Sequence, residues 1–467
     1  MCGIICIFNK LNIDLIQNIK HRGQESYGIA FPYNNKFILH NFIGKLPKQI
    51  PLNISSYSTL INPLKYIIGH TRYSTSGQKI LDMQTQPLLG TTIISNIPKQ
   101  YILVHNGNIS NREGLNRIFN CDINEKYSDT QILVSIINKL TKNSWEEIFE
   151  EILNKIPGVY NLIMGTENEV YIVRDRYGVR PLCITKEKNS DVNYCILSES
   201  NKIADYNYEI VRDVNPGELV KLSDNGLETI TFNSSLETKI LETKFMPCSF
   251  EYIYFSSKKS VYDDVNITQF RYNCGKKLAE HDKYFYFGKD NRNIIVVGAP
   301  ETGITSGMGY ADHLNLNYHQ ILYKKSEGRT FILDENNREK ECKIKYGILD
   351  NVVKDKVVII LDDSLVRGNT MKVLVNQLKK AQVESIHIRI ASPPVISPCY
   401  YGIDIPTYKE LIANKFNGNI SEINSYLGST SLKYMTTDEI LDILPHKNKN
   451  ACVSCFTNDY KPELLEW

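Results

Sequence analysis

Cys2 directly follows the initiator methionine and opens the apolar run MCGIICIF at residues 1–8, which predicts a buried strand. Removal of the methionine, which a small second side chain permits, would leave a thiol and a free α-amine on one residue. A cysteine thiol ordinarily has a pKa of about 8.5 and an α-amine one of about 8, so the amine can accept the thiol proton near neutral pH. Cys2 is therefore a candidate nucleophile that carries its own base. The alternative is a chance start with an inert, packed thiol, because free cysteines are usually buried.

Polar clusters at residues 21–24, 69–77 and 105–108 each stand where an apolar or helical stretch stops. Attack on the amide of a glutamine needs a cation for its α-carboxylate, an anion for its α-amine and donors for the oxyanion. Arg72, Asp129 and the pair Asn106–Gly107 supply these three needs. Each has a structural alternative: Asn-Gly is a common turn, Ser-Asp a common helix cap, and an exposed arginine is usually solvated. In combination they favour a glutamine site.

Seven strings between Cys2 and about Val220 carry a family resemblance: MCGIICIF, HRGQES, GHTRYSTSG, HNGNI, RDRYGVRPL, LSES and DVNPGE. They resemble the N-terminal-nucleophile glutaminase domain of class II glutamine amidotransferases. The resemblance implies Cys2 as nucleophile and amine base, and Asn106 and Gly107 as oxyanion donors. It also implies four glutamine-binding residues, namely Arg72, Asp129, His21 and Arg22.

A second candidate site follows the apolar run VVIIL at residues 357–361, which ends at Asp362 and Asp363. The next residues, SLVRGNT, lead into a predicted helix. A glycine-containing loop at a helix N-terminus can bind phosphate, and adjacent carboxylates can hold ribose hydroxyls and a hard cation such as Mg²⁺. The alternative is a pair of acids that merely caps a helix.

The string LDDSLVRGNT resembles the phosphoribosyltransferase fingerprint for 5-phosphoribosyl 1-pyrophosphate, with a pyrophosphate loop at residues 299–303. A closing loop is expected at about 324–332. Three segments depart from the family pattern: SSKKS at 256–260, APETG at 299–303 and YKKSEGRTFI at 323–332. The resemblance implies Mg²⁺ at Thr302, Asp362 and Asp363, and substrate contacts from Asp362, Asp363, Ser364, Arg367, Gly368, Asn369, Thr370, Glu301, Thr302, Gly303 and Arg329.

Cys452 and Cys455 form a CxxC pair near the C-terminus, and Cys248 and Cys399 are further candidate ligands. Spacing alone leaves structural zinc, an iron–sulfur cluster and a redox dithiol open. The strings PCSFEYIYF, SPPVISPCYYGID and CVSCF resemble the cluster-bearing branch of one family. That resemblance implies one 4Fe-4S cluster on Cys248, Cys399, Cys452 and Cys455. The remaining thiols are expected in the core or on the surface: Cys6, Cys121, Cys183, Cys195, Cys274 and Cys342.

Together the two halves resemble glutamine phosphoribosylpyrophosphate amidotransferases almost from end to end. This implies that glutamine yields ammonia at the first site and that ammonia displaces pyrophosphate at the second. The implied product is 5-phosphoribosylamine, at the first committed step of de novo purine synthesis. Purine nucleotide inhibitors and a homo-oligomer, tetramer or dimer, are implied as well. Two rivals are an amidotransferase that aminates fructose 6-phosphate, which would need a sugar-isomerase half, and a non-catalytic regulator that binds phosphoribosylpyrophosphate.

Length and composition indicate two domains. A chain of 467 residues exceeds what one hydrophobic core usually serves. A formal net charge of +2 argues against a nucleic-acid or membrane-surface partner. Eleven cysteines, with no secretion signal and no apolar run of membrane length, favour reduced thiols and a cytoplasmic location.

The element pattern changes across a polar stretch at about 222–243, which we expect to link domains at 1–235 and 236–467. Before it, short alternating strands predict two packed antiparallel sheets with helices outside, which the resemblance makes a four-layer αββα N-terminal-nucleophile hydrolase domain. After it, expected strands at 294–298, 356–361 and 385–391 alternate with helices at 307–314 and 370–381. This α/β pattern predicts a parallel sheet with ligands at the carboxyl ends of its strands, as in type I phosphoribosyltransferases. The fold class is thus α+β followed by α/β.

Overall fold

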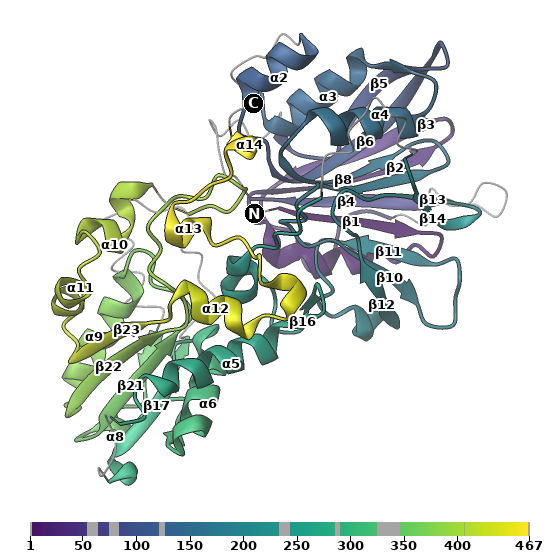
Figure 1. Cartoon of the computed structure of the whole chain (residues 1–467). Helices are drawn as coiled ribbons and strands as arrows, with labels where there is room; N and C mark the ends of the chain where they lie inside the picture. The colour runs from purple at the N-terminus through teal and green to yellow at the C-terminus, as the bar shows by residue number, and fades with distance from the viewer. Residues whose placement is uncertain are drawn as a thin grey trace.

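The computed structural model describes residues 2–53, 64–73, 84–120, 127–232, 243–284, 290–324, 346–405 and 407–465. Its N-terminal half contains two seven-stranded sheets, and its C-terminal half contains a five-stranded sheet. Figure 1 shows the two halves side by side, with the N-terminus at their junction. The predicted fold class is confirmed.

The first sheet centres on β1, all of whose residues are buried, as the sequence predicts. β1 pairs antiparallel with β4 on one side and with β11 on the other. The strand order is β12-β10-β11-β1-β4-β2-β3. The bounds are β1 (Gly3–Phe8), β2 (Ser26–Tyr33), β3 (Lys36–Ile43), β4 (Tyr66–Arg72), β10 (Cys183–Glu187), β11 (Tyr194–Leu197) and β12 (Tyr208–Asp213).

The second sheet has the order β14-β13-β9-β8-β6-β5-β7 and is antiparallel except where β5 meets β7. One face packs on the first sheet, because alternate residues such as Ile4 and Phe8 of β1 share a core with Ile102 and Val104 of β6. The bounds are β5 (Leu88–Ile94), β6 (Ile97–Asn108), β7 (Thr141–Lys142), β8 (Val159–Gly165), β9 (Val170–Arg174), β13 (Leu219–Ser223) and β14 (Gly226–Ile230).

Helices cover both outer faces of this sandwich. Ile16 and Ile19 of η1 pack on Ile5 and Ile7 of the first sheet, and α3 and α4 pack on the second sheet. The helix on the first sheet is a 3-10 helix rather than an α-helix. The bounds are η1 (Ile13–Arg22), α2 (Arg112–Phe119), α3 (Asp129–Lys139), α4 (Trp145–Lys155) and η3 (Ile203–Tyr206).

The expected linker at 222–243 is corrected in its first part. β13 and β14 form a hairpin there, joined by a turn at Asp224 and Asn225, because the Asp-Asn-Gly sequence suits a tight turn between strands. Residues 233–242 lie outside the described residues, so the domain limit at 235 stays a prediction. Beyond them, the N–H groups of Met246 and Cys248 donate to carbonyls at Tyr177 and Val179.

The C-terminal half is built on a parallel sheet with the order β18-β17-β21-β22-β23. Three strands agree with the predicted ranges within one residue. Helices α5 and α6 supply the core on one face, and α9 and α11 supply it on the other. The bounds are β17 (Ile294–Gly298), β18 (Asn317–Tyr318), β21 (Val357–Asp362), β22 (Ser385–Ile390), β23 (Ser431–Tyr434), α5 (Ile267–Glu280), α6 (Gly303–Leu314), α9 (Asn369–Lys380) and α11 (Ile420–Leu427).

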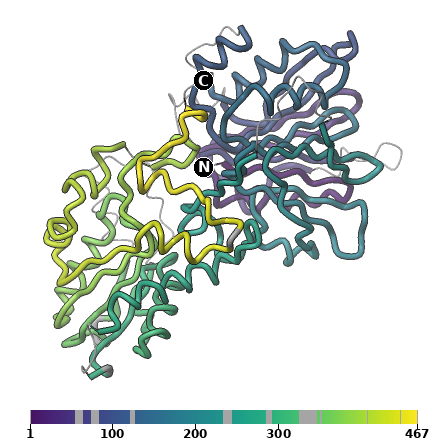
Figure 2. Tube along the Cα trace, viewed as in Figure 1, coloured from purple at the N-terminus to yellow at the C-terminus, as the bar shows by residue number. Residues whose placement is uncertain are grey.

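The C-terminal tail returns to the junction between the halves, as Figures 1 and 2 show in yellow. The main chain of Cys452 there pairs with that of Cys248 in an isolated parallel β-bridge. None of the helices in the described ranges is long and apolar enough to cross a membrane. Shorter elements complete the chain: η4 (Glu251–Phe255, a π-helix), β15 (Val261–Tyr262), β16 (Val265–Asn266), η5 (Asn291–Asn293), β19 (Leu322–Lys324), β20 (Tyr346–Ile348), α8 (Asp350–Val353), η6 (Tyr408–Glu410), α10 (Ile412–Lys415), α12 (Thr437–Ile443), η7 (His446–Asn448), α13 (Ser454–Thr457) and α14 (Pro462–Leu465).

Candidate active sites

Cys2 lies at the start of β1, with its Sγ 3.7 Å from the carbonyl oxygen of Tyr73. The thiol is half-buried. β1 pairs with β4 so that Gly3 stands opposite Thr71, which brings the end of β4 beside Cys2. The sheet therefore places the candidate nucleophile next to Arg72, as the glutamine site requires.

The expected oxyanion pair, Asn106 and Gly107, lies at the end of β6 against β8. A side chain at Gly107 would meet the carbonyl oxygen of Val159 at 2.0 Å, so only glycine fits there. The Asn106 amide lies 3.4 Å from the hydroxyl of Ser198, which also accepts a 2.9 Å hydrogen bond from the N–H of Ile4. Ser198 thus joins Asn106 to β1. Sequence reasoning did not select Ser198, although it belongs to the LSES string at the end of β11.

Arg72 is 7 % exposed and donates to the side-chain oxygen of Gln84 at 2.5 Å. Its Nη1 is buried without a hydrogen-bond partner in the described part of the chain, which suits a ligand carboxylate. Asp129 is the first residue of α3, where the Ser128 hydroxyl caps the helix. Its carboxylate lies 3.6 Å from His105 Nδ1. Both predicted glutamine anchors therefore lie at the ends of elements that meet the Cys2 region.

Two histidines flank this region as neutral imidazoles. Burial, and after it the charge of Arg72, lowers the pKa of His70 to about 3. Burial also lowers the pKa of His105, although the Asp129 carboxylate partly opposes the shift. Near neutral pH, neither imidazole carries the proton that a general acid would donate.

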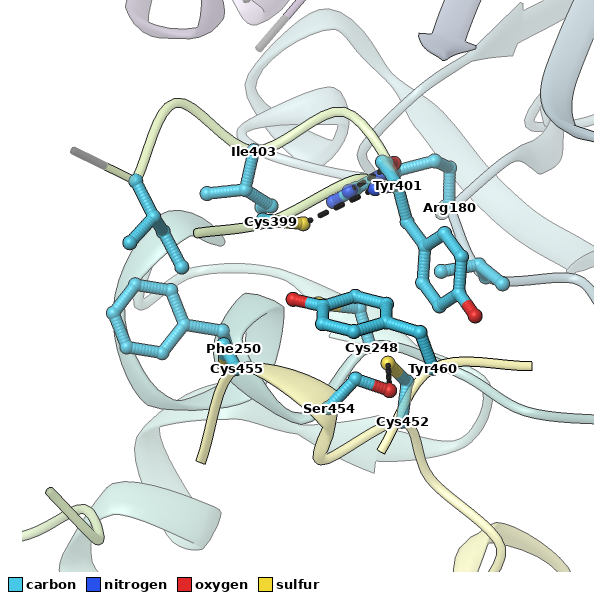
Figure 3. A pocket seen from close by; sticks show the side chains of 12 residues that line it. Arg180, Cys248, Phe250, Cys399, Tyr401, Ile403, Cys452, Ser454, Cys455 and Tyr460 are labelled. Atoms are coloured by element: carbon cyan, nitrogen blue, oxygen red, sulfur yellow. Dashed lines mark hydrogen bonds between the residues drawn. The ribbon is translucent and has the colours of Figure 1, made fainter. Parts of the chain in front are cut away.

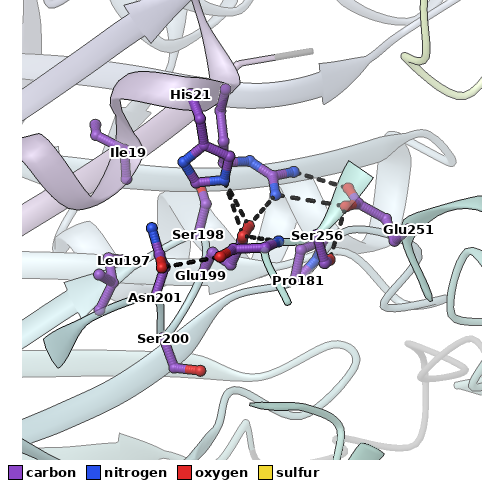
Figure 4. A network of polar contacts seen from close by, with 12 residues as sticks. Ile19, His21, Pro181, Leu197, Ser198, Glu199, Ser200, Asn201, Glu251 and Ser256 are labelled. Carbon is purple, nitrogen blue, oxygen red and sulfur yellow. Dashed lines mark hydrogen bonds and ion pairs between the residues drawn. The ribbon is translucent and has the colours of Figure 1, made fainter. Parts of the chain in front are cut away.

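His21 points at the carboxylate of Glu199 (Figure 4), and Arg22 also pairs with buried carboxylates. His21 Nε2 lies 2.9 Å from Glu199 Oε1, and Arg22 donates to Glu199 at 3.0 Å and to Glu251 at 2.7 Å. The Arg22 side chain is fully buried. The arrangement differs from the glutamine contact that the resemblance implies for Arg22.

The second site forms at the carboxyl ends of β17 and β21, where the two predicted loops meet. The hydroxyl of Thr302 donates to Asp363, and that of Ser364 donates to the same carboxylate at 2.7 Å. A side chain at Gly303 would meet the carbonyl oxygen of Leu361 at 2.3 Å, so the loop at 299–303 needs glycine there. Burial and the neighbouring charge of Asp363 raise the pKa of Asp362.

The remaining predicted residues of this site frame the start of α9. Gly368 has a φ of +80° immediately before Asn369 and Thr370, the first residues of the helix. This left-handed conformation explains the glycine in the fingerprint. Arg367 lies 3.2 Å from Glu410, and Glu301 belongs to the loop at 299–303. Arg329 and most of the expected closing loop lie outside the described residues.

Two tyrosines lie between the sites. Burial raises the pKa of the Tyr73 hydroxyl, and the nearby Asp404 and Tyr254 of the C-terminal half add to this shift. Burial, followed by the charges of Asp363 and Asp362, raises the pKa of Tyr254 to about 12. Sequence reasoning did not select them, because residues so far apart along the chain meet only in the folded protein.

The four cysteines proposed as ligands line one cavity with Phe250, Tyr401 and Tyr460 (Figure 3). The N–H of Tyr401 donates to Cys399 Sγ at 3.4 Å, and the guanidinium of the buried Arg180 faces Cys248 and Cys399. Within the described ranges, no three His, Cys, Asp or Glu side chains are arranged to hold a single metal ion. Among the other thiols, Cys6, Cys183, Cys195 and Cys274 are buried, as expected, whereas Cys121 and Cys342 lie outside the described residues.

The segment that carries Cys399 also touches the oxyanion pair. Asn108 Nδ2 and Ser110 Oγ donate to the carbonyl oxygen of Tyr400 at 2.7 and 2.9 Å. A Cβ on Gly402, whose φ is +97°, would lie 2.9 Å from the carbonyl carbon of Gly107. The cysteine cavity and the glutamine site therefore share one packed segment.

Fold and sites define a two-domain enzyme of the glutamine amidotransferase class that carries a phosphoribosyltransferase. Family models agree: a glutamine amidotransferase domain matches residues 70–204, and a phosphoribosyl transferase domain matches residues 265–392. The chain is 30% identical to the amidophosphoribosyltransferase of Methanocaldococcus jannaschii, over 99% of this chain and 98% of that protein. It is 32% identical to that of Synechococcus elongatus, over 96% and 87%. The chain belongs to the amidophosphoribosyltransferase family.

Solved structures agree with this assignment. One is described as the allosteric regulatory enzyme of purine biosynthesis; it has a TM-score of 0.80 and 29% identity over 98% of this chain and 96% of that one. Another is the glutamine phosphoribosylpyrophosphate amidotransferase of B. subtilis complexed with ADP and GMP. It has a TM-score of 0.79 and 29% identity, over 98% and 97%. Both similarities extend over the two domains and their junction.

Proposed function

We propose that the protein converts 5-phosphoribosyl 1-pyrophosphate and glutamine to 5-phosphoribosylamine, glutamate and pyrophosphate, at the first committed step of purine synthesis. One observation carries this function: a terminal-thiol glutamine site and a phosphoribosyl fingerprint face the same junction, with Tyr73 and Tyr254 between them. Protonated ammonia is no nucleophile, so ammonia must pass between the sites without meeting bulk water. The contact between the domains serves that need.

In the glutamine half, the Cys2 thiolate attacks the side-chain amide while its own α-amine holds the proton that leaves with ammonia. The unpaired Nη1 of Arg72 would bind the α-carboxylate, and Asp129 would bind the α-amine. Asn106 and the N–H of Gly107 would stabilise the oxyanion. Water then releases glutamate from the thioester.

In the phosphoribosyl half, Asp362 and Asp363 would hold the ribose hydroxyls, and the loops at 299–303 and 364–370 would bind the phosphates. Mg²⁺ would fit at Thr302, Asp362 and Asp363, because one or two carboxylates and substrate oxygens are the ligands it commonly takes. When bound, it would offset the negative charge that builds on the departing pyrophosphate.

We also propose one 4Fe-4S cluster on Cys248, Cys399, Cys452 and Cys455. The four thiols line one cavity, and four cysteine thiolates are the common ligand set of such a cluster. The family resemblance of the three cysteine-containing strings supports the cluster over zinc. The group would tie the C-terminal tail to the rest of the protein.

Further proposals concern partners and location. Purine nucleotides are proposed as inhibitors, since the related B. subtilis structure contains ADP and GMP. A homo-oligomer, tetramer or dimer, and a cytoplasmic location are proposed too. The location is supported by the cysteines of the described ranges, none of which is paired in a disulfide. The fructose 6-phosphate reaction is not favoured, because the C-terminal half matches a phosphoribosyl transferase domain. A non-catalytic regulator is not favoured either, because the chain keeps the nucleophile and both carboxylates.

The test separates the two half-reactions. Cys2→Ser should abolish pyrophosphate release with glutamine and leave release with ammonia within about twofold of wild type, because the second site needs only ammonia. Asp363→Asn, the matched variant of the other half, should lower both rates. Equal loss of both activities in Cys2→Ser would contradict the proposed division between the sites. An active enzyme that retains its initiator methionine would contradict the role of the α-amine.

A further inference from the structure

A buried cluster of ion pairs connects the main chain of Cys2 to the C-terminal domain. Its two carboxylates, Glu199 and Glu251, are labelled in Figure 4. Arg22 donates from Nε to the carbonyl oxygen of Cys2 at 3.2 Å. Its other two nitrogens meet Glu199, at the end of β11, and Glu251, the first residue of η4. The side chains of Arg22, Glu199 and Glu251 are at most 1% exposed. The Arg22 guanidinium thus bonds to the main chain of Cys2 through one nitrogen and to Glu251 of the second domain through another.

Glu251 is the branch point of this cluster. It accepts from Arg22 at 2.7 Å, from the Ser256 hydroxyl at 3.2 Å and from Arg180 at 3.5 Å. The N–H of Ser257, from the same segment, donates to Glu199 at 2.6 Å. Two arginines thereby balance two carboxylates in a water-excluded site. Charges that are this deeply buried hold a defined geometry, because any movement leaves one of them unpaired.

We infer that Glu251 is a positioning residue for the glutaminase reaction: through Arg22, it fixes the main chain of Cys2 and so the direction of its thiol. This inference rests on the proposed function, because it assigns a role in glutamine attack. It also assigns Arg22 a role other than the glutamine contact implied by resemblance. Neither side chain reaches open space from its buried place, so neither would contribute to glutamine affinity.

Glu251→Gln tests the inference, because it keeps the shape of the side chain and removes its charge. The kcat of glutamine hydrolysis should fall roughly tenfold while the KM for glutamine stays within about twofold, as expected when a nucleophile is misplaced and the substrate contacts remain. Pyrophosphate release with ammonia should stay within about twofold of wild type. Iodoacetamide should also alkylate Cys2 more slowly than in wild type, which mass spectrometry of the N-terminal peptide would measure.

Asp282→Asn is the matched control. Asp282 is an equally buried carboxylate of the same domain, paired with Arg389 and Lys433. Loss of this charge should change glutamine- and ammonia-dependent rates in equal proportion. Should Glu251→Gln fail to fold, Glu251→Asp, which keeps the charge and shortens the reach, should give an intermediate kcat.

Three outcomes would overturn the inference. They are parallel loss of both activities in Glu251→Gln, a raised KM with unchanged kcat, and an unchanged rate of Cys2 alkylation. A wild-type protein without glutamine-dependent activity would instead refute the proposed function. Even then, the alkylation rates of wild type and Glu251→Gln would decide whether Glu251 positions the thiol.

Discussion

At the scale of single residues, the proposed glutamine site contains positions where no other side chain fits. Gly107 has the carbonyl oxygen of Val159 on one side and Gly402 of the second domain on another. The motif predicts an oxyanion role for Gly107. The contact of Gly107 with Gly402 could not be predicted, because it joins segments almost 300 residues apart. The same holds for Ser198, whose hydroxyl links Asn106 to β1.

Gly107→Ala should therefore disable the oxyanion pair. The added methyl would lie 2.0 Å from a main-chain oxygen, so the N–H of residue 107 must move, and we expect a roughly 100-fold loss of glutamine-dependent activity. Ammonia-dependent activity, measured on the same preparation, should persist. Gly158→Ala is the control, since its nearest neighbours are side-chain atoms at 3.3 and 3.4 Å that can adjust. Equal effects of the two variants would show that Gly107 has no special place in the site.

At the scale of elements, the long apolar runs predicted the parallel strands well, because strands covered on both faces need continuous hydrophobic sequence. The predicted run at 294–298 is β17 itself. The pattern missed β14, an edge strand whose residues are exposed or half-buried, so burial left no periodic signal. The helix expected at 307–314 begins four residues earlier, at Gly303. Gly303, the first residue of α6, lies against the main chain of Leu361 at the end of β21.

Sequence patterns also did not predict that Arg22 would link Glu199, after β11, to Glu251 of η4. This link depends on the buried charge of Glu199. Burial alone would raise the pKa of Glu199, but His21 and Arg22 outweigh it and lower that pKa to about 2. Because the folded-state pKa is below the ordinary value of about 4.3, ionised Glu199 stabilises the folded protein above that pH. This contribution is lost as the pH falls from about 4.3 toward 2. Urea unfolding at several pH values should show that wild type loses more of its free energy of unfolding across this window than Glu199→Gln.

The exposed Glu228 of β14 provides the control for that titration. Glu228→Gln should leave the pH dependence of the free energy of unfolding close to that of wild type. If Glu199→Gln and wild type lost stability in parallel below pH 4, the ion pairs at the junction would have no net stabilising effect on the folded state.

At the scale of the whole molecule, one segment connects the cysteine cavity to the glutamine site. Cys399 lines the cavity, and its neighbour Tyr400 accepts hydrogen bonds from Asn108 and Ser110, next to the oxyanion pair. Cys452 of the C-terminal tail also lines this cavity, and its main chain pairs with that of Cys248 in a β-bridge. The four thiols were predicted from family motifs. Their proximity to Asn106 and Gly107 was not predicted, because it results from the packing of the two domains.

Cys452→Ser should show whether the cysteine cavity supports the glutamine site. Since one proposed cluster ligand is then missing, we expect anaerobically purified protein to contain fewer than about four irons per chain and to unfold at a temperature lower by roughly 5 °C. Glutamine-dependent activity should fall more than ammonia-dependent activity, because the Cys399 segment packs on Gly107. Cys274→Ser, at a buried thiol of α5 outside the cavity, should keep its iron and the wild-type ratio of the two activities. Wild-type protein that contains zinc in place of iron would contradict the proposed cluster. An unchanged ratio of the two activities in Cys452→Ser would show that the cysteine cavity does not support the glutamine site.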